Sequence, residues 1–271
     1  MAASDAPVIE RLTEMDVDGG MALSHDARWN QTPDDWRHFI NHGMTFGIRD
    51  GDRRLVASAA ALPYDGPYGF VGMVLVTPQW RRKGLATRLV DRCIEELKRL
   101  GRTPVLDATA DGVKVYVRQG FVPQFDFDRW QGQAYGGNPQ IGTVPPVRDL
   151  DAAANGARRD RLMQDFLARS DTITVGDASG FAMIRTGHRA FQAGPVVAAD
   201  PSTATNLVAH LFDQVSGLVY IDVPSIWSQL GAWLGARGFE IQRSFTRMAL
   251  GRAEPFCRRD RLFAVAGPEF G

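Results

Sequence analysis

The sequence has few cysteines, no long apolar run and no excess of charge of one sign. Its two cysteines, Cys93 and Cys257, are too sparse for a disulfide framework, and neither lies in a metal-ligand spacing. No apolar run approaches the roughly 18 residues that a membrane helix needs, and residues 1–7 lack the basic and apolar regions of a signal peptide. We therefore expect a cytoplasmic chain with reduced thiols, no metal and no membrane partner.

The charges balance, with 31 basic and 31 acidic side chains in 271 residues. This balance does not indicate a nucleic-acid binder that works by neutralising phosphates, so a site for an anion must be local. The apolar fraction of 44% and the charged fraction of 23% are those of an ordinary folded protein. Because domains commonly have about 100 to 150 residues, the length predicts two of them.

A local anion site is indicated where a short apolar strand, residues 74–76, runs into a basic turn and then a helix. The turn brings Arg81, Arg82 and Lys83 to the start of the helix, and Gly84 lets the backbone approach a ligand. Cations at a helix N-terminus oppose the dipole by about 0.3 to 1 kcal/mol unless an anion is present. The alternative is a solvated helix start whose charges serve solubility, but this placement favours a pyrophosphate site.

Hydrophobic periodicity and turn residues divide the chain into alternating strands and helices. In the first half we expect strands at residues 8–12, 45–49, 55–62, 70–76 and 104–108 and from residue 121 onward, and helices at 15–29, 33–42, 81–100 and 112–118. In the second half we expect helices at 161–168, 203–215 and 226–236 and strands at 172–175, 180–185, 196–199 and 218–223. A stretch rich in Gly and Pro between about 132 and 150 lies between them. The expected domains are residues 1–135 and 150–271, with a linker at 136–149.

The second half resembles a diverged copy of the first. Gly120-Phe121 matches Gly238-Phe239, and the strand ending in Asp107 matches the one ending in Asp222. At the place of the basic turn, residues 198–206 contain no Arg, Lys or Gly. We therefore expect a single anion site per chain, in the N-terminal half, and a structural or acceptor-binding role for the C-terminal half.

The order strand, long helix, strand, short helix, and the spacing Arg-x-x-Gly-x-Ala after Val-x-Pro, resemble motif A of the GNAT superfamily of acetyl-CoA-dependent N-acyltransferases. The resemblance implies an α+β fold of two tandem domains, each a mixed, mostly antiparallel twisted sheet flanked by helices. It implies that the first sheet is splayed between its fourth and fifth strands and holds acetyl-CoA there. The implied coenzyme contacts are Val74, Leu75, Val76, Arg81, Arg82, Lys83, Gly84, Leu85, Ala86 and Thr87.

By the same resemblance, Tyr116 occupies the place of the general acid that protonates the departing coenzyme thiolate, where the second copy has Leu234. The alternative is a tyrosine that only packs at a helix end. The carboxylate that serves some members as general base, early in the motif-A strand, is replaced here by Phe70. No general base can be carried over from the family.

Acceptor contacts in this family usually come from the first two helices and the loop between them, which indicates Trp29 and Asn30. Asp107 is a further candidate, because it lies near the end of the strand beside the splay and could attract or deprotonate an amine. Its alternative is a cap on the following turn, and its match with Asp222 favours a structural role. His25, His38 and His42 show no metal-ligand pattern and are expected on solvated helix faces.

The leading hypothesis is an N-acetyltransferase that moves an acetyl group from acetyl-CoA to a primary amine of a small molecule by direct attack. A second hypothesis is acetylation of a protein N-terminus or lysine. A third, of another class, is a non-catalytic acyl-CoA-binding regulator, which the missing strand carboxylate and the degenerate copy favour. The oligomeric state, monomer or homodimer, is left open.

Overall fold

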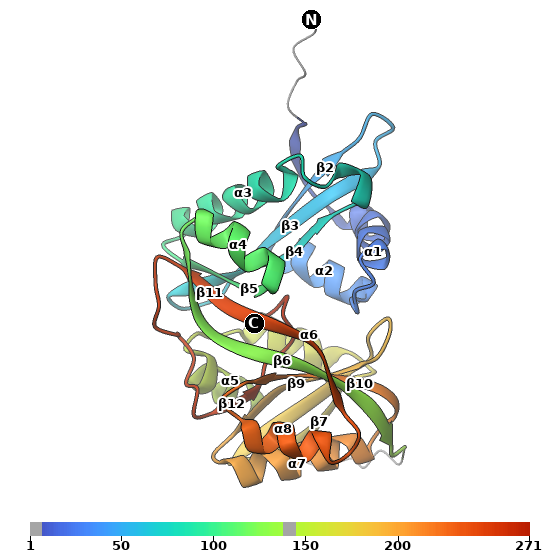
Figure 1. Ribbon diagram of the computed structural model, residues 1–271, viewed down its shortest axis with the longest axis vertical. Helices are drawn as coiled ribbons and strands as arrows, with labels where there is room; N and C mark the ends of the chain where they lie inside the picture. The colour runs from blue at the N-terminus through green and yellow to red at the C-terminus, as the bar shows by residue number, and fades with distance from the viewer. Residues whose placement is uncertain (1–6, 138–144) are drawn as a thin grey trace, which may run out of the picture.

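The computed structural model describes residues 7–137 and 145–271, and it builds both halves of the chain on one continuous sheet. Twelve strands form this sheet, with eleven in the order β1-β2-β3-β4-β5-β11-β6-β10-β9-β8-β7 and β12 paired to β9. Among the described strands, only the pairs β4–β5 and β9–β10 run parallel. Figure 1 shows the N-terminal half above the C-terminal half, with β6 and β11 crossing between them.

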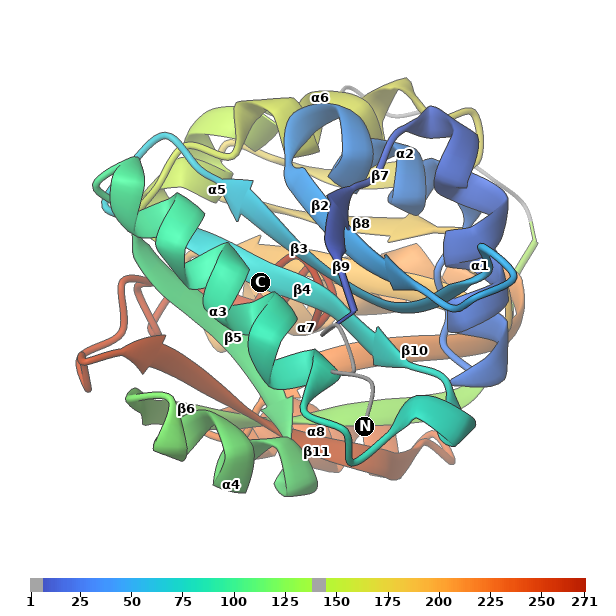
Figure 2. The same ribbon diagram turned by 90° about the horizontal axis from the view of Figure 1, so that it is seen from above.

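The N-terminal half places its strands and helices close to the expected positions. Its strands are β1 (Ile9–Arg11), β2 (Met44–Arg49), β3 (Leu55–Pro63), β4 (Tyr68–Val76), β5 (Thr103–Thr109) and β6 (Phe121–Tyr135). Its helices are the short 3-10 turns η1 (Glu14–Asp16) and η2 (Pro78–Trp80), and the α-helices α1 (Val17–Asp26), α2 (Pro33–His42), α3 (Leu85–Arg99) and α4 (Ala110–Arg118). Figure 2, seen from above, shows α3 and α4 on one side of β4 and β5 and α1 and α2 on the other.

The C-terminal half repeats this order. Its helices are α5 (Val147–Asn155), α6 (Asp160–Ala168), α7 (Pro201–Asp213) and α8 (Ser228–Gly235). Its strands are β7 (Ile173–Asp177), β8 (Gly180–Arg185), β9 (Phe191–Ala198), β10 (Ser216–Pro224), β11 (Glu240–Leu250) and β12 (Leu262–Ala264). The sequence did not indicate α5, β11 or β12, and of the predicted linker at 136–149, residues 138–144 lie outside the described residues.

The two halves exchange their long strands. β6, from the N-terminal half, pairs with β10 of the C-terminal half, and β11 pairs with β5 of the N-terminal half. The exchanged strands also pair with each other, with Phe127 opposite Phe245 and their rings stacked at 5.2 Å. The strand expected from residue 121 onward therefore exists, but it does not return within its own half.

The long helix begins four residues later than the sequence pattern indicated. The turn before α3 contains Arg82 with φ 61° and Gly84 with φ 76°, and a right-handed helix cannot include such backbone. Gly84 is the N-cap in the left-handed conformation, so the prediction of helix at residues 81–84 was wrong. The first helix is also shorter than predicted, since Arg28 has φ 56° and Trp29 and Asn30 lie in the loop that follows.

Burial follows the expected amphipathic patterns, with one exception. α3 turns a stripe toward the sheet that consists of Leu85, Leu89, Val90, Cys93, Ile94 and Leu97. α2 begins with a capping box between Thr32 and Asp35, with Pro33 at its first position. On this helix His38 is 3% exposed and lies 3.3 Å from Asp165, so the expectation of a solvated helix face was wrong for it. No helix in the described part of the chain is long and apolar enough to cross a membrane.

Candidate active site

β4 and β5 separate part-way along their length. They pair at Tyr68, Gly69 and Phe70 of β4, and the remainder of β4, up to Val76, has no strand partner on that side among the described residues. The sheet is thus splayed between its fourth and fifth strands, as the family resemblance implies. The splay leaves the edge of Val74, Leu75 and Val76 available for pairing with an extended ligand.

A bulge in β4 lies at the start of this free edge. The register with β3 shifts between Ser58 and Ala60, opposite Met73 of β4, which has φ 53°. The Ser58 hydroxyl donates to the Met73 carbonyl at 2.8 Å and holds the bulge in place. A bulge turns backbone N–H and C=O groups away from their hydrogen-bond partners in the neighbouring strand. This bulge lies where β4 separates from β5.

The N-terminus of α3 lies at the far end of the free edge and carries uncompensated positive charge. No side chain caps this helix, and a Cβ on Gly84 would meet no atom within 4 Å. Arg81, Arg82 and Lys83 are exposed and form no ion pair in the described structure. Arg81 donates to the Val76 carbonyl at 3.1 Å, and the Lys83 ammonium lies 4.4 Å from the Trp80 ring. Open helix N–H groups beside free cations make a suitable site for a phosphate group.

Tyr116 projects from α4 toward the splay. Thr109 caps this helix through its hydroxyl, which accepts from the Gly112 N–H. The Tyr116 ring contacts Phe121 edge-on at a centroid distance of 5.9 Å, and its hydroxyl forms no hydrogen bond with any of the described residues. Burial raises the pKa of Tyr116 to about 12, so the phenol keeps its proton at neutral pH.

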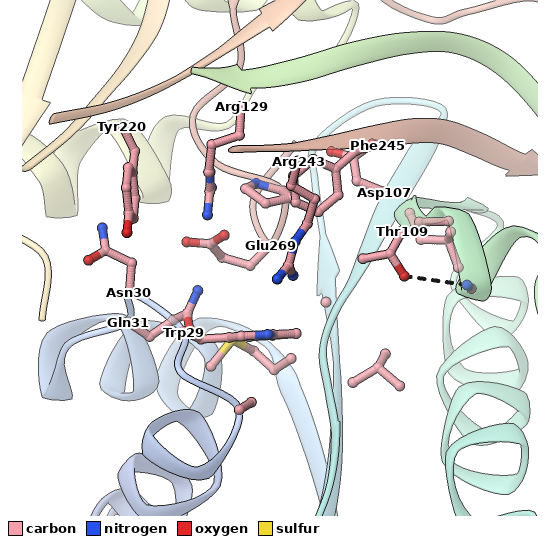
Figure 3. Close-up of a pocket in the computed structure, with 18 of the residues that line it drawn as sticks. Trp29, Asn30, Gln31, Asp107, Thr109, Arg129, Tyr220, Arg243, Phe245 and Glu269 are labelled. Carbon is pink, nitrogen blue, oxygen red and sulfur yellow. Dashed lines mark hydrogen bonds between the residues drawn. The ribbon is translucent and has the colours of Figure 1, made fainter. Parts of the chain in front are cut away.

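A cavity of about 420 Å³ connects these parts to the C-terminal half. From the N-terminal half it is lined by the β4 bulge, the end of β5, Tyr116 and the α1–α2 loop. From the exchanged strands and the C-terminal half it receives Arg129, Tyr220, Arg243, Phe245 and Glu269, all visible in Figure 3. The site is therefore built by both halves of the chain.

The α1–α2 loop contributes the two residues expected to contact an acceptor. Trp29 lines the cavity and is half-buried. Asn30 also lines it, but its side chain binds the β8–β9 loop: the amide donates to the Ala190 carbonyl at 3.0 Å and its oxygen accepts from the N–H groups of Arg189 and Ala190. Asn30 thus joins the two halves. Beside them, the Oε1 atom of Gln31 is buried without a hydrogen-bond partner.

Asp107 lines the cavity, and both of its oxygens are bound by Arg247 from β11, at 2.8 and 2.7 Å. Neither side chain is more than 6% exposed. Burial raises the pKa of Asp107, and the guanidinium acts in the opposite direction. Thr109, and not Asp107, caps the turn after β5, so the alternative role as a cap was wrong; the role of Asp107 as an acceptor contact stays a prediction.

The matching residue, Asp222, has the mirrored partner. Arg129 from β6 binds both of its oxygens, at 2.9 and 2.8 Å. Each half therefore supplies an aspartate, and each exchanged strand supplies the arginine that binds it. The sequence match between Asp107 and Asp222 reflects these paired salt bridges, which only the strand exchange creates.

Glu269 is the one carboxylate among the cavity residues of the described structure that sequence reasoning missed. It belongs to a loop near the end of the sequence, 7% exposed, and its carboxyl group points into the cavity. Burial raises its pKa to about 7. The sequence offered only a weak signal, a lone acidic residue between Pro268 and Phe270 after an apolar run at residues 262–266.

The corresponding region of the second half is occupied by the chain itself. The Asp200 side chain accepts from the N–H groups of Ser202 and Thr203 at the start of α7. The Ser202 and Thr203 hydroxyls also donate to Asp200, and these hydrogen bonds, that of the Ser202 hydroxyl first, lower the pKa of Asp200 to about 2. Along β9, beyond its parallel pairing with β10, the edge pairs with β12 at Val196 and Val197. A metal site is likewise not apparent, because no group of three or more His, Cys, Asp or Glu side chains gathers as ligands within residues 7–137 and 145–271.

Comparisons with known proteins match each half of the chain to a family model. Residues 11–121 match the sequence model described as "Acetyltransferase (GNAT) family", and residues 147–264 match "Acetyltransferase (GNAT) domain". The uncharacterized N-acetyltransferase YitH of Bacillus subtilis strain 168 is 25% identical over 248 residues, which are 84% of this chain and 86% of YitH.

Solved structures match over nearly the whole length. One from Pyrococcus horikoshii has a TM-score of 0.81 at 18% identity and covers 100% of this chain and 99% of its own. A tandem GNAT protein from the clavulanic acid biosynthesis pathway has a TM-score of 0.60 at 13% identity, with 90% and 98% covered. These similarities extend to the fold of both halves together.

Proposed function

Because the chain is a GNAT-family N-acetyltransferase with two GNAT domains in tandem, we propose that it transfers the acetyl group of acetyl-CoA to a primary amine of a small molecule. The acetyl-CoA binds in the β4–β5 splay, with its pantetheine along Val74, Leu75 and Val76. Its pyrophosphate lies on the turn and the first turn of α3, residues 81–87.

The observation that carries this proposal is the continuity of the cavity. It runs from the β4 bulge past Tyr116 to the loop that carries Trp29, and its volume of about 420 Å³ suits a small ligand. A small-molecule acceptor is favoured over a protein lysine, which would need a longer open groove.

The reaction needs no covalent enzyme intermediate. The amine attacks the thioester carbonyl, a backbone N–H of β4 near Leu75 stabilises the oxyanion, and Tyr116 gives its proton to the departing thiolate. Tyr116 suits this role because its raised pKa keeps the hydroxyl protonated until the thiolate forms. A metal is not needed for any of these steps, and a cytoplasmic location remains a prediction.

The test is a thermal-shift titration with acetyl-CoA, followed by measurement of coenzyme A release with amino acids, polyamines, aminoglycosides and amino sugars. We expect stabilisation by acetyl-CoA and release with at least one class of amine. If acetyl-CoA stabilises the protein but coenzyme A is released neither with the amine panel nor with a pool of lysate proteins, the acyl-CoA-binding regulator would be favoured. Release only with the protein pool would favour the protein acetyltransferase, and the absence of stabilisation would refute the coenzyme site.

A further inference from the structure

The loop that carries Glu269 is fixed against β4 from several sides. A Cβ added to Gly72 would lie 2.5 Å from the Glu269 carbonyl oxygen. The loop therefore crosses β4 in direct contact with its backbone. Phe270 is fully buried and stacks on Phe39 at 4.9 Å. The Phe270 carbonyl accepts from the Tyr64 hydroxyl at 2.6 Å and from Arg159 at 3.2 Å. This anchoring holds the Glu269 side chain beside the β4 bulge.

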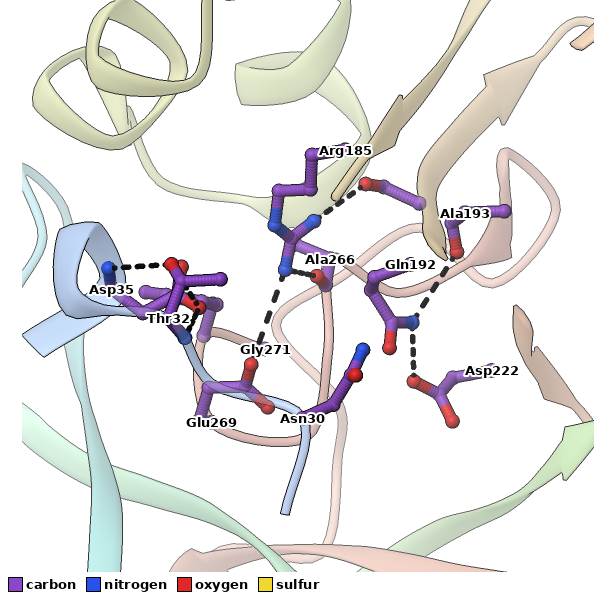
Figure 4. Close-up of polar contacts among 12 residues, drawn as sticks. Asn30, Thr32, Asp35, Arg185, Gln192, Ala193, Asp222, Ala266, Glu269 and Gly271 are labelled. Carbon is purple, nitrogen blue, oxygen red and sulfur yellow. Dashed lines mark hydrogen bonds and ion pairs between the residues drawn. The ribbon is translucent and has the colours of Figure 1, made fainter. Parts of the chain in front are cut away.

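The Glu269 carboxyl lacks the close partner that the other cavity carboxylate has. Asp107 and Glu269 are the two carboxylates that line the cavity, and Asp107 is bound on both oxygens by Arg247. Glu269 forms an ion pair with Arg185 of β8, but at 3.9 Å the contact is beyond hydrogen-bonding distance. Arg185 gives its own hydrogen bonds to the carbonyls of Gly194 and Ala266 (Figure 4). Glu269 is thus a fixed carboxyl that, unlike Asp107, is not bound on both oxygens by a guanidinium and can accept a hydrogen bond from a ligand.

We propose that Glu269 is the catalytic base of the acetyl transfer and takes the proton from the acceptor amine, directly or through one water. This inference rests on the proposed function. It supplies, from the C-terminal half, the group that β4 lacks at Phe70. The catalytic groups then come from different halves, the acid Tyr116 from the first and the base Glu269 from the second.

The protons balance as follows. The acceptor enters as an ammonium, and the Glu269 carboxylate removes one proton to give the neutral amine. The nitrogen lone pair forms the C–N bond, the C–S bond breaks with its electron pair on sulfur, and Tyr116 protonates the thiolate. The second proton of the nitrogen returns through water to the Tyr116 oxygen, and Glu269 releases its proton to solvent. One thioester and one ammonium yield an amide, a thiol and one proton.

The charges around Glu269 give it a pKa suited to this role. Burial raises the pKa to about 7, the guanidinium groups of Arg185 and Arg129 act against this rise, and Asp35 of α2 adds to it. Arg243 of β11 and Tyr220 of β10 also face the cavity. A base that titrates near the working pH is ionised in a large fraction of molecules and still binds a proton well. Activity should therefore rise with pH through about 7 and level above it.

The test compares pH profiles of kcat/KM for the wild type, Glu269→Gln and the control Glu254→Gln, an exposed glutamate of the same half. The acceptor is the best amine of the panel used for the proposed function. We expect kcat/KM of Glu269→Gln to fall about 100-fold or more at neutral pH. The rise of its pH profile near 7 should disappear, while acetyl-CoA should still stabilise the variant. Glu269→Asp should keep the limb at reduced rate, and Glu254→Gln should match the wild type.

A wild-type profile in Glu269→Gln would overturn the assignment and leave the proposed function standing. A wild type that releases no coenzyme A with any amine would instead refute the proposed function. A second measurement is independent of the acceptor: the carboxyl carbon of Glu269 is followed by NMR in protein with labelled glutamate, and Glu269→Gln assigns the signal. A midpoint near 7 is expected, and a midpoint near 4, as for an ordinary glutamate, would also overturn the assignment.

Discussion

The two GNAT domains of this chain differ most where a coenzyme would bind. In the first, β4 leaves β5 after Phe70 and keeps a free edge, and α3 begins after Gly84 with no capping side chain among the described residues. In the second, β12 pairs with the edge of β9, and Asp200 binds the first N–H groups of α7. In the second domain, the chain's own residues thus occupy both of the positions that are open in the first domain.

The comparison shows how the chain itself can satisfy, in one domain, the backbone groups that stay open in another domain of the same fold. A carboxylate at a helix N-terminus satisfies the same N–H groups that a phosphate would, and a paired strand satisfies the same edge that an extended ligand would. The segment that begins with β12 then continues to Glu269 in the cavity of the first domain. The segment that pairs with β9 in the second domain is therefore also the one that brings Glu269 to the cavity.

The largest effect, on acetyl-CoA binding, is expected when carboxylates are placed at the N-terminus of α3, as Asp200 is placed at that of α7. Arg82→Glu with Gly84→Glu places two carboxylates where the proposed pyrophosphate lies and adds a side chain at φ 76°. Charge repulsion should weaken acetyl-CoA binding by roughly 100-fold or more and abolish the thermal shift. The measurement is an acetyl-CoA thermal-shift titration.

Its matched control lies in the second domain. Ala86 and Ser202 are each the second residue of their helix, so Ala86→Glu should weaken binding while Ser202→Glu should not. Equal losses from both would contradict the assignment of a single coenzyme per chain.

The second effect is on stability and concerns the two crossed salt bridges. Arg247→Met leaves Asp107 buried without its partner, and such losses cost about 3 to 5 kcal/mol of the free energy of unfolding. Arg129→Met should cost less, because the Arg129 side chain is 12% exposed rather than 6%. Urea denaturation measures both changes. A loss from Arg129→Met larger than that from Arg247→Met would break the expected ranking.

These salt bridges also show where sequence reasoning ends. The basic turn and the repeat could be predicted because they rest on local spacing and on matches within the chain. The splay and the place of Tyr116 were implied by the resemblance to the GNAT family. Sequence reasoning matched Asp107 with Asp222, but it did not find Arg247 or Arg129. Those partners lie 140 and 93 residues away, on strands that the two halves exchange.

The same limit explains the cavity residues. Asn30 was chosen as a polar residue in an acceptor loop, but its amide binds a loop 160 residues later. Glu269 was missed because nothing near it in sequence indicates that it reaches β4. The start of α3 was placed too early because positive φ at Arg82 is a property of the turn that its residue type does not indicate.

Tyr116 provides a smaller effect that separates catalysis from binding. Tyr116→Phe removes one hydroxyl and should lower kcat by about 100-fold, while acetyl-CoA stabilises the variant as it does the wild type. Because the pKa is raised to about 12, the wild type should show no loss from Tyr116 ionisation below about pH 10. Steady-state kinetics measure both, with Tyr135→Phe, an exposed tyrosine, as the control. Unchanged kcat in Tyr116→Phe would leave the residue a packing role only.

The smallest effect is expected at Asp200, where the second domain is filled. Asp200→Ala removes the acceptor for the Ser202 and Thr203 N–H groups and should lower the melting temperature by about 2 °C at pH 7. The folded pKa of about 2 is depressed, so this contribution is present above the ordinary value near 4 and fades as the pH falls toward 2. Calorimetry at several pH values would show the gap closing in acid. Asp200→Ala should not bind a second acetyl-CoA, because β12 still covers the edge of β9. Binding of two coenzymes per chain would show that Asp200 alone had closed the site.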